Sequence, residues 1–149
     1  MATYPVFLCH VWSVEDGMER INSLMADYSR KKEGKFQYEF RSVSKDDPVQ
    51  FLRSNKALIE SIETQMEQCC CAVLLAGIYE EYKRWTNLEL DASKKLKVPL
   101  ILVQAADPRY TSYKEKRAAN AIIDWDDVAL GEAIEQFAKK SKIIADEYS

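Results

Sequence analysis

The sequence has 149 residues, the usual length of one domain, and a chain of this size can bury a sizeable core. Hydrophobic residues make up 47% and charged residues 30%, with only 4 Gly and 4 Pro, which excludes collagen-like, low-complexity and wholly disordered chains. The net charge of −3 argues against a surface built for nucleic acid or anionic lipid. The chain start shows no secretory leader pattern, and the longest apolar run, Cys69–Ile78, is too short to span a membrane. We therefore expect a single domain over residues 1–149 in the cytoplasm, without nucleic-acid or membrane partners.

The histidine and cysteine content restricts metal and disulfide chemistry. His10 is the only histidine, which excludes every metal site that needs two imidazoles. The four cysteines stand at 9, 69, 70 and 71, and adjacent cysteines can build neither a loop-closing disulfide framework nor paired Cys-x-x-Cys zinc ligands. We expect reduced, buried thiols and no metal site.

The first half of the chain alternates strand and helix patterns. An apolar run at 6–9 is typical of a strand buried on both faces, and apolar residues at helical spacing from Met18 predict a helix that stops at Gly34. Residues 36–41 alternate apolar and polar side chains, which predicts a strand at the sheet edge. Asp47 and Pro48 form a helix-start signal for a second helix that reaches about Cys69.

The second half continues the alternation. A buried central strand is predicted at 71–77, a helix from about Tyr79 or Glu80 to Lys97, and a buried strand at 99–103. Residues 105–119 have no clean period and predict a long, partly helical connection. A short strand at 121–123 and a helix with its apolar stripe from Val128 to Phe137 complete the domain. Strands alternating with helices imply parallel pairing, so we predict an α/β, flavodoxin-like three-layer fold with a central parallel sheet of about five strands.

In such sheets, ligands bind at the carboxyl ends of the strands. The loops at 10–17, 42–47, 77–81 and 104–107 are therefore the candidate site. The sequence has no Gly-x-Gly-x-x-Gly and no P-loop motif, so any phosphate binding has to use helix N-termini.

Trp85 and Glu89 are the most specific local feature of these regions. They stand four residues apart on one predicted helix and therefore share a face, which places a carboxylate beside a large aromatic ring. One interpretation puts Glu89 at the rim of the core, partly desolvated and held in a fixed direction. The alternative is that Trp85 only fills the core while Glu89 pairs with Lys83 or Lys94 at the surface.

Several stretches of the sequence resemble the TIR-like family, in particular the bacterial members that include the sensor subunit of the Thoeris anti-phage system. The resemblance rests on Phe7-Leu8-Cys9-His10, on Ala72-Val-Leu-Leu-Ala-Gly77 followed by Tyr79 and Trp85-Thr-Asn-Leu-Glu89, on Lys97-Val-Pro-Leu-Ile101, and on Ile122-Ile-Asp-Trp125. Against the family pattern, Cys9 stands where serine is commoner, and Val11-Trp12 replaces polar residues.

The resemblance implies a TIR-like fold and an NAD-consuming enzyme that cleaves the nicotinamide–ribose bond and makes an ADP-ribose-derived, cyclic nucleotide signal in anti-phage defence. Glu89 corresponds to the family's catalytic glutamate. The substrate-binding side of the site would comprise His10, Val11, Trp12, Ser44, Asp46, Gly77, Tyr79 and Trp85. NAD enters as substrate and no cofactor is bound; self-association and a phage-derived trigger protein are the expected partners.

Other interpretations stay open. His10 is as readily a structural histidine as a ligand contact, and Asp47 before Pro48 is explained by helix capping. Many TIR domains keep the fold only as protein-interaction modules, so a non-catalytic module is the alternative function. A nucleoside deoxyribosyltransferase-like enzyme, in which the glutamate is a covalent nucleophile, is a further alternative.

Overall fold

The computed structural model describes residues 3–10, 17–43, 55–76, 83–104 and 112–141. In chain order its elements are β1 (Thr3–Leu8), α1 (Gly17–Lys31), β2 (Gln37–Arg41), α2 (Lys56–Met66), β3 (Cys71–Leu75), α3 (Lys83–Leu96), β4 (Leu100–Val103), α4 (Tyr113–Ala118), β5 (Ala121–Ile123) and α5 (Asp127–Lys139). The five strands form one sheet in the order β2-β1-β3-β4-β5, and every pair of neighbours is parallel. This confirms the predicted α/β, flavodoxin-like architecture.

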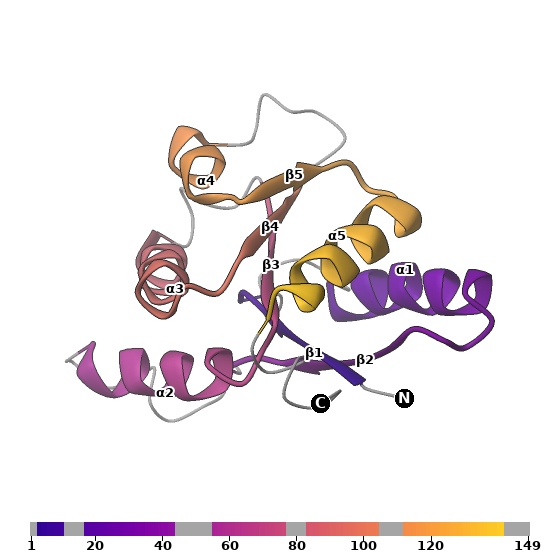
Figure 1. The fold of residues 1–149 in the computed structure, drawn as a ribbon. Helices are drawn as coiled ribbons and strands as arrows, with labels where there is room; N and C mark the ends of the chain where they lie inside the picture. Colours follow the sequence, from indigo (N-terminus) through magenta and orange to yellow (C-terminus); the bar gives the residue numbers. More distant parts are fainter. Residues whose placement is uncertain (1–2, 11–16, 44–54, 77–82, 105–111, 142–149) are drawn as a thin grey trace.

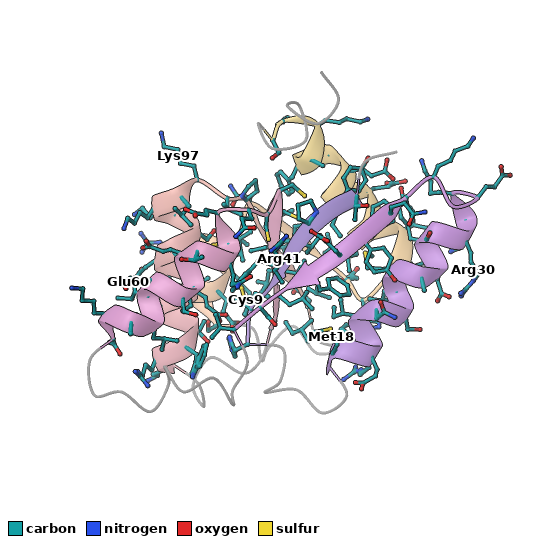
Figure 2. All side chains as sticks on the ribbon, turned by 90° about the horizontal axis from the view of Figure 1, so that it is seen from below. Cys9, Met18, Arg30, Arg41, Glu60 and Lys97 are labelled. Carbon is teal, nitrogen blue, oxygen red and sulfur yellow. The ribbon has the colours of Figure 1, made fainter. Side chains whose placement is uncertain are left out.

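Two apolar layers cover the two faces of the sheet. Helices α1 and α5 pack side by side on one face, and α2 and α3 lie on the other (Figure 1). Alternate side chains of β1 point to opposite faces of the sheet. Val6 and Leu8 pack in the layer with α1 and α5, whereas Phe7 packs in the layer with α2 and α3. All five residues of β3 are buried, as expected for a central parallel strand. The interior therefore forms on both sides of the strands, and Figure 2 shows Cys9 within it and Arg30, Glu60 and Lys97 at the outside.

The local sequence explains where most elements begin and end. In α1 the buried Ile21, Met25 and Tyr28 recur at helical spacing, and the helix ends just before Gly34, whose positive φ of 77° turns the chain. β1 starts at Thr3, three residues before the predicted start. Pro5 stays within the strand, and its carbonyl accepts a hydrogen bond from the Cys70 amide.

The predicted boundaries differ most at α2. Its described helix begins at Lys56, with Asn55 at the N-cap position, and the predicted start at Asp47 and Pro48 lies outside the described residues. The partly helical connection predicted over 105–119 contains α4, whose N-terminus has a complete capping box of Ser112 and Glu115. The edge position of β2 and the short β5 are as predicted.

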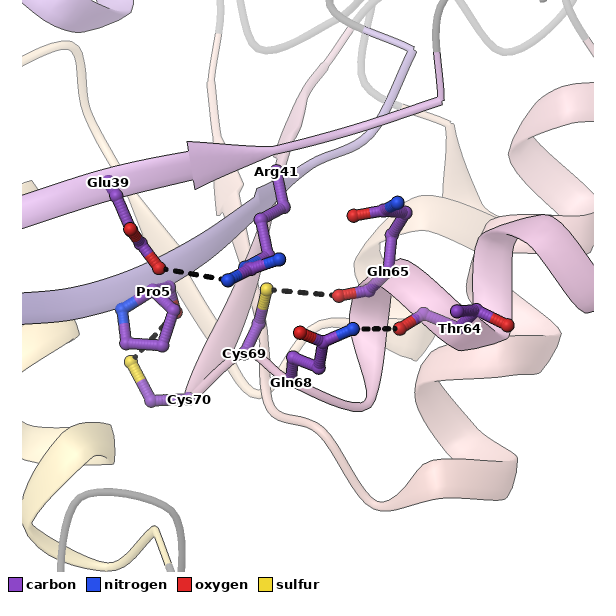
Figure 3. Close-up of polar contacts among 8 residues, drawn as sticks. All are labelled: Pro5, Glu39, Arg41, Thr64, Gln65, Gln68, Cys69 and Cys70. Carbon is purple, nitrogen blue, oxygen red and sulfur yellow. Dashed lines mark hydrogen bonds and ion pairs between the residues drawn. The ribbon is translucent and has the colours of Figure 1, made fainter. Parts of the chain in front are cut away.

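The cysteines are free and buried, as the sequence indicates. The Cys69 thiol donates to the Gln65 carbonyl and the Cys70 thiol to the Pro5 carbonyl (Figure 3). Burial raises the pKa of Cys69 to about 12, although the nearby Arg41 acts in the opposite direction. The Cys69 thiol is therefore a protonated packing group at neutral pH.

Candidate active site

The candidate site forms where β1 ends against the inner face of α3. His10 follows β1 after one further residue, and Glu89 lies in the middle of α3. The two are 79 positions apart in sequence, and the fold joins them because β1 and β3 are neighbours in the sheet while α3 follows β3. Both are completely buried, with exposed fractions of 0% for His10 and 1% for Glu89.

His10 holds both oxygens of the Glu89 carboxylate. The His10 backbone N–H donates to Oε2 at 2.9 Å, and ring Nδ1 makes a very short contact with Oε1. Thr86, one turn before Glu89 on α3, lies with its Oγ1 at 3.2 Å from His10 Nε2. The His10 ring therefore contacts the Glu89 carboxylate through Nδ1 and the Thr86 hydroxyl through Nε2. His10 thus fixes the direction of the Glu89 carboxylate, and Thr86 in turn orients the His10 ring.

The backbone at His10 is unusual. Its φ is 22°, in a region that non-glycine residues seldom occupy. Strained backbone of this kind persists only where the surroundings over-determine it, and it concentrates at functional sites. Here it coincides with the residue whose amide and ring both contact Glu89.

Burial favours the protonated form of the Glu89 carboxyl. Removal from water raises the pKa of the Glu89 carboxyl, and the hydrogen bonds and charge of His10 oppose that rise without cancelling it. Burial and the Glu89 charge also raise the pKa of the neighbouring Cys9 thiol. Cys9 therefore lies beside the site as a neutral thiol rather than as a nucleophilic thiolate.

The structure places Glu89 deeper than the sequence indicates and gives it a different partner. The residue is fully buried rather than at the rim of the core, and its partner is His10 rather than Lys83 or Lys94. Trp85 is 6% exposed and packs in the core layer formed with α2 and α3, so the shared buried face of Trp85 and Glu89 is as predicted. Thr86 was missed, although its position three residues before Glu89 on the same helix could have indicated it.

Among the predicted site residues, the structure brings together His10, Glu89 and the buried face of α3 that carries Trp85. The predicted substrate-binding residues that lie outside the described residues are Val11, Trp12, Ser44, Asp46, Gly77 and Tyr79. Within the described ranges, no group of three His, Cys, Asp or Glu side chains could hold a metal ion. In the same ranges, no helix is long and apolar enough to cross a membrane.

A family model described as "Thoeris protein ThsB, TIR-like domain" matches residues 7–109, more than half of the chain and the whole segment from His10 to Glu89. The chain belongs to this family. It is a TIR-like, Thoeris-associated protein, as the resemblance in its sequence indicates. No curated protein sequence matches it.

Two solved structures share the fold of this ThsB-type chain. One is a 3-dehydroquinate dehydratase-like protein from Bifidobacterium longum, with a TM-score of 0.50, 13% identity, and coverage of 93% of this chain and 97% of the other. The second is the CMP N-glycosidase BcmB from Clostridium botulinum, with a TM-score of 0.50, 17% identity, and coverage of 89% of this chain and 98% of the other. At these identities the likeness concerns the fold alone.

The raised pKa of Glu89 gives the ThsB-type domain a testable pH dependence. The folded state holds the Glu89 proton more tightly than the unfolded chain does, so this carboxyl favours folding as it protonates. Its contribution to the free energy of unfolding therefore decreases as pH rises from the ordinary glutamate range through the higher folded pKa. Carboxyl ¹³C NMR should show the Glu89 signal titrating above the ordinary glutamate range, and that signal should be absent from Glu89→Gln. A Glu89 midpoint at or below those of the exposed glutamates would contradict the burial described here.

Proposed function

We propose that this ThsB-type TIR-like protein is an enzyme that cleaves the nicotinamide–ribose bond of NAD and makes an ADP-ribose-derived, cyclic nucleotide signal in anti-phage defence. The observation that supports this most is the buried Glu89 carboxylate, held by both the backbone and the ring of His10 at the carboxyl end of β1. Ligands of open α/β sheets bind at this edge.

The chemistry requires one fixed carboxylate. When the bond between ribose C1′ and the pyridinium nitrogen breaks, its electron pair leaves with nicotinamide, which becomes neutral, and positive charge develops at C1′. A preoriented carboxylate in a water-poor site stabilises that charge. The ADP-ribosyl group is then captured by water, which loses a proton, or by one of its own nucleophilic atoms, which closes the cyclic product.

The proposed reaction requires the site to open. Because Glu89 is 1% exposed and both its oxygens are held by His10, a ribose reaches the carboxylate only after neighbouring groups move. We propose that self-association or a phage-derived trigger protein produces this opening. In the open site, the residues at 11, 12, 44, 46, 77 and 79 would line the substrate beside His10 and Trp85.

The test is product analysis by liquid chromatography and mass spectrometry. NAD is incubated with concentrated protein, with and without extract from phage-infected cells. We expect nicotinamide release by the wild type and a loss on the order of a hundredfold in Glu89→Gln, because the charge that faces C1′ is removed. Glu60→Gln, which removes an exposed carboxylate on α2, is the matched control and should keep full activity.

Each remaining outcome assigns a different function. Equal activity of Glu89→Gln and wild type would contradict the catalytic role of Glu89. No release under any condition from folded protein would support the non-catalytic interaction module. A parallel incubation with CMP is included because the second structural neighbour is named a CMP N-glycosidase, and its bond is also N-glycosidic. Release of cytosine but not nicotinamide would assign an N-glycosidase that acts on CMP instead of NAD. A sugar adduct trapped on Glu89 would support the deoxyribosyltransferase-like alternative.

A further inference from the structure

A hollow lies between the C-terminal half of α3 and the short helix α4. Its volume is about 800 Å³, within the range of small-molecule sites. Val98 and Pro99 before β4, and Asn120 before β5, form part of its lining. The hollow therefore lies toward the amino ends of β4 and β5, whereas the His10–Glu89 pair follows the carboxyl end of β1. The two sites share α3 but are separate.

The charge of the hollow is opposite to that of the whole chain. Its lining carries four cationic side chains, Lys94, Lys97, Lys114 and Arg117, and one acidic side chain, Asp91, in a protein of net charge −3. Lys94, Lys97 and Arg117 form no ion pair with a carboxylate of any residue the structure describes. An anionic ligand would provide the missing negative charge.

The lining of the hollow also contains one exposed aromatic ring, that of Tyr113. Tyr113 at the start of α4 is 74% exposed, and the Arg117 guanidinium lies 5.8 Å from the centre of its ring. An exposed tyrosine face beside arginine is suited to stacking a flat base, and the buried Leu90 and Val98 add apolar surface. The lining thus combines groups for a phosphate with a surface for a base.

The backbone at Lys97 adds an independent observation. Lys97 follows the last residue of α3 with a φ of 57°, while the Lys97 and Val98 amides donate to the Lys94 and Ser93 carbonyls. This is a Schellman end, where glycine is usual because other residues are strained at positive φ. A lysine at this position gives up the stability that glycine would provide and keeps a cation in the lining of the hollow.

We propose that the hollow between α3 and α4 binds a nucleoside 5′-phosphate, with the phosphate held by Lys94, Lys97 and Arg117 and the base stacked on Tyr113. The proposal does not depend on the reaction at Glu89. A free mononucleotide and the nucleoside-phosphate part of a larger nucleotide share this chemistry.

The experiment is isothermal titration calorimetry of the full chain with AMP, with adenosine and inorganic phosphate as separate probes. We expect AMP to bind more tightly than either component. Arg117→Gln and Lys97→Gly should each weaken AMP binding about tenfold, the loss of one charge-assisted contact. Tyr113→Ala should weaken AMP and adenosine but not phosphate. ADP-ribose in place of AMP tests the larger nucleotide.

Two controls distinguish binding of AMP in the hollow from non-specific attraction of AMP to surface cations and from unfolding of a variant. Lys116 lies on α4 but does not line the hollow. The Lys116→Gln variant should therefore bind AMP with the same affinity as the wild type. Lys97→Gly should raise the melting temperature while it weakens binding, because glycine relieves the positive φ. In ¹H–¹⁵N NMR spectra, AMP should shift the amide signals of Lys97 and Asn120 rather than that of His10.

Three results would overturn the proposal. They are no AMP binding at millimolar concentration, an equal loss of affinity in Lys116→Gln and Arg117→Gln, or amide shifts centred on His10 instead of the hollow.

Discussion

Replacement of His10 by alanine should destabilise the protein by about 3 to 5 kcal/mol, because it leaves the buried Glu89 carboxylate without the ring that faces it. The fully buried Thr86 hydroxyl also loses its contact with Nε2, and the missing ring leaves a cavity. Urea unfolding followed by circular dichroism at neutral pH measures the loss.

The double variant His10→Ala/Glu89→Gln separates the charge from the cavity. A neutral amide at position 89 carries no buried charge, so the double variant should be more stable than the sum of the two single effects predicts, by about 1 kcal/mol or more. Strict additivity would show that the two side chains are not energetically coupled. In that case the contact between them would be incidental to the fold.

Gly131→Ala is expected to cost about 3 kcal/mol, although Gly→Ala in a helix interior normally stabilises a protein. A Cβ at position 131 would lie 2.2 Å from Cδ2 of Tyr28, with two further ring atoms within 2.4 Å. The Tyr28 ring is held in place by a T-shaped contact with Phe36, at 4.9 Å between centroids, and by a hydrogen bond from its hydroxyl to Glu135. The close packing of α1 on α5 therefore leaves no space for a methyl group.

Gly34→Ala is the matched comparison. A Cβ there meets nothing within 4 Å, and the only penalty is the positive φ of 77°, about 1 kcal/mol. Thermal unfolding of the two variants should rank Gly131→Ala well below Gly34→Ala. The reverse order would contradict the interlocking of Tyr28 and Gly131.

The sequence predicts the fold well because its pattern is local. The continuous apolar runs at β1, β3 and β4, and the helical spacing of Ile21, Met25 and Tyr28, each need only a few neighbouring residues to be recognised. Parallel pairing then follows from the alternation of strands with helices.

The site is harder to predict because it depends on contacts that are distant in sequence. The helical periodicity identifies Glu89 and Trp85 as sharing a face, but the periodicity cannot show that this face meets the end of β1. Nearby lysines therefore compete with His10 as partners of Glu89. The importance of Thr86 likewise depends on where His10 Nε2 lies, and the positive φ of His10 has no signal in the sequence.

The buried cysteines provide internal reporters of how this molecule opens. Cys9 lies next to His10 in the candidate site, and Cys71 begins the central strand, and both thiols are closed to solvent with raised pKa. An alkylating reagent can therefore reach either sulfur only during a transient opening, and the labelling rate measures the free energy of that opening. If Cys9 is modified faster than Cys71, the β1 end of the site separates while the central strand stays folded. The order in which these two thiols are modified thus distinguishes a local opening beside Glu89 from unfolding of the whole domain.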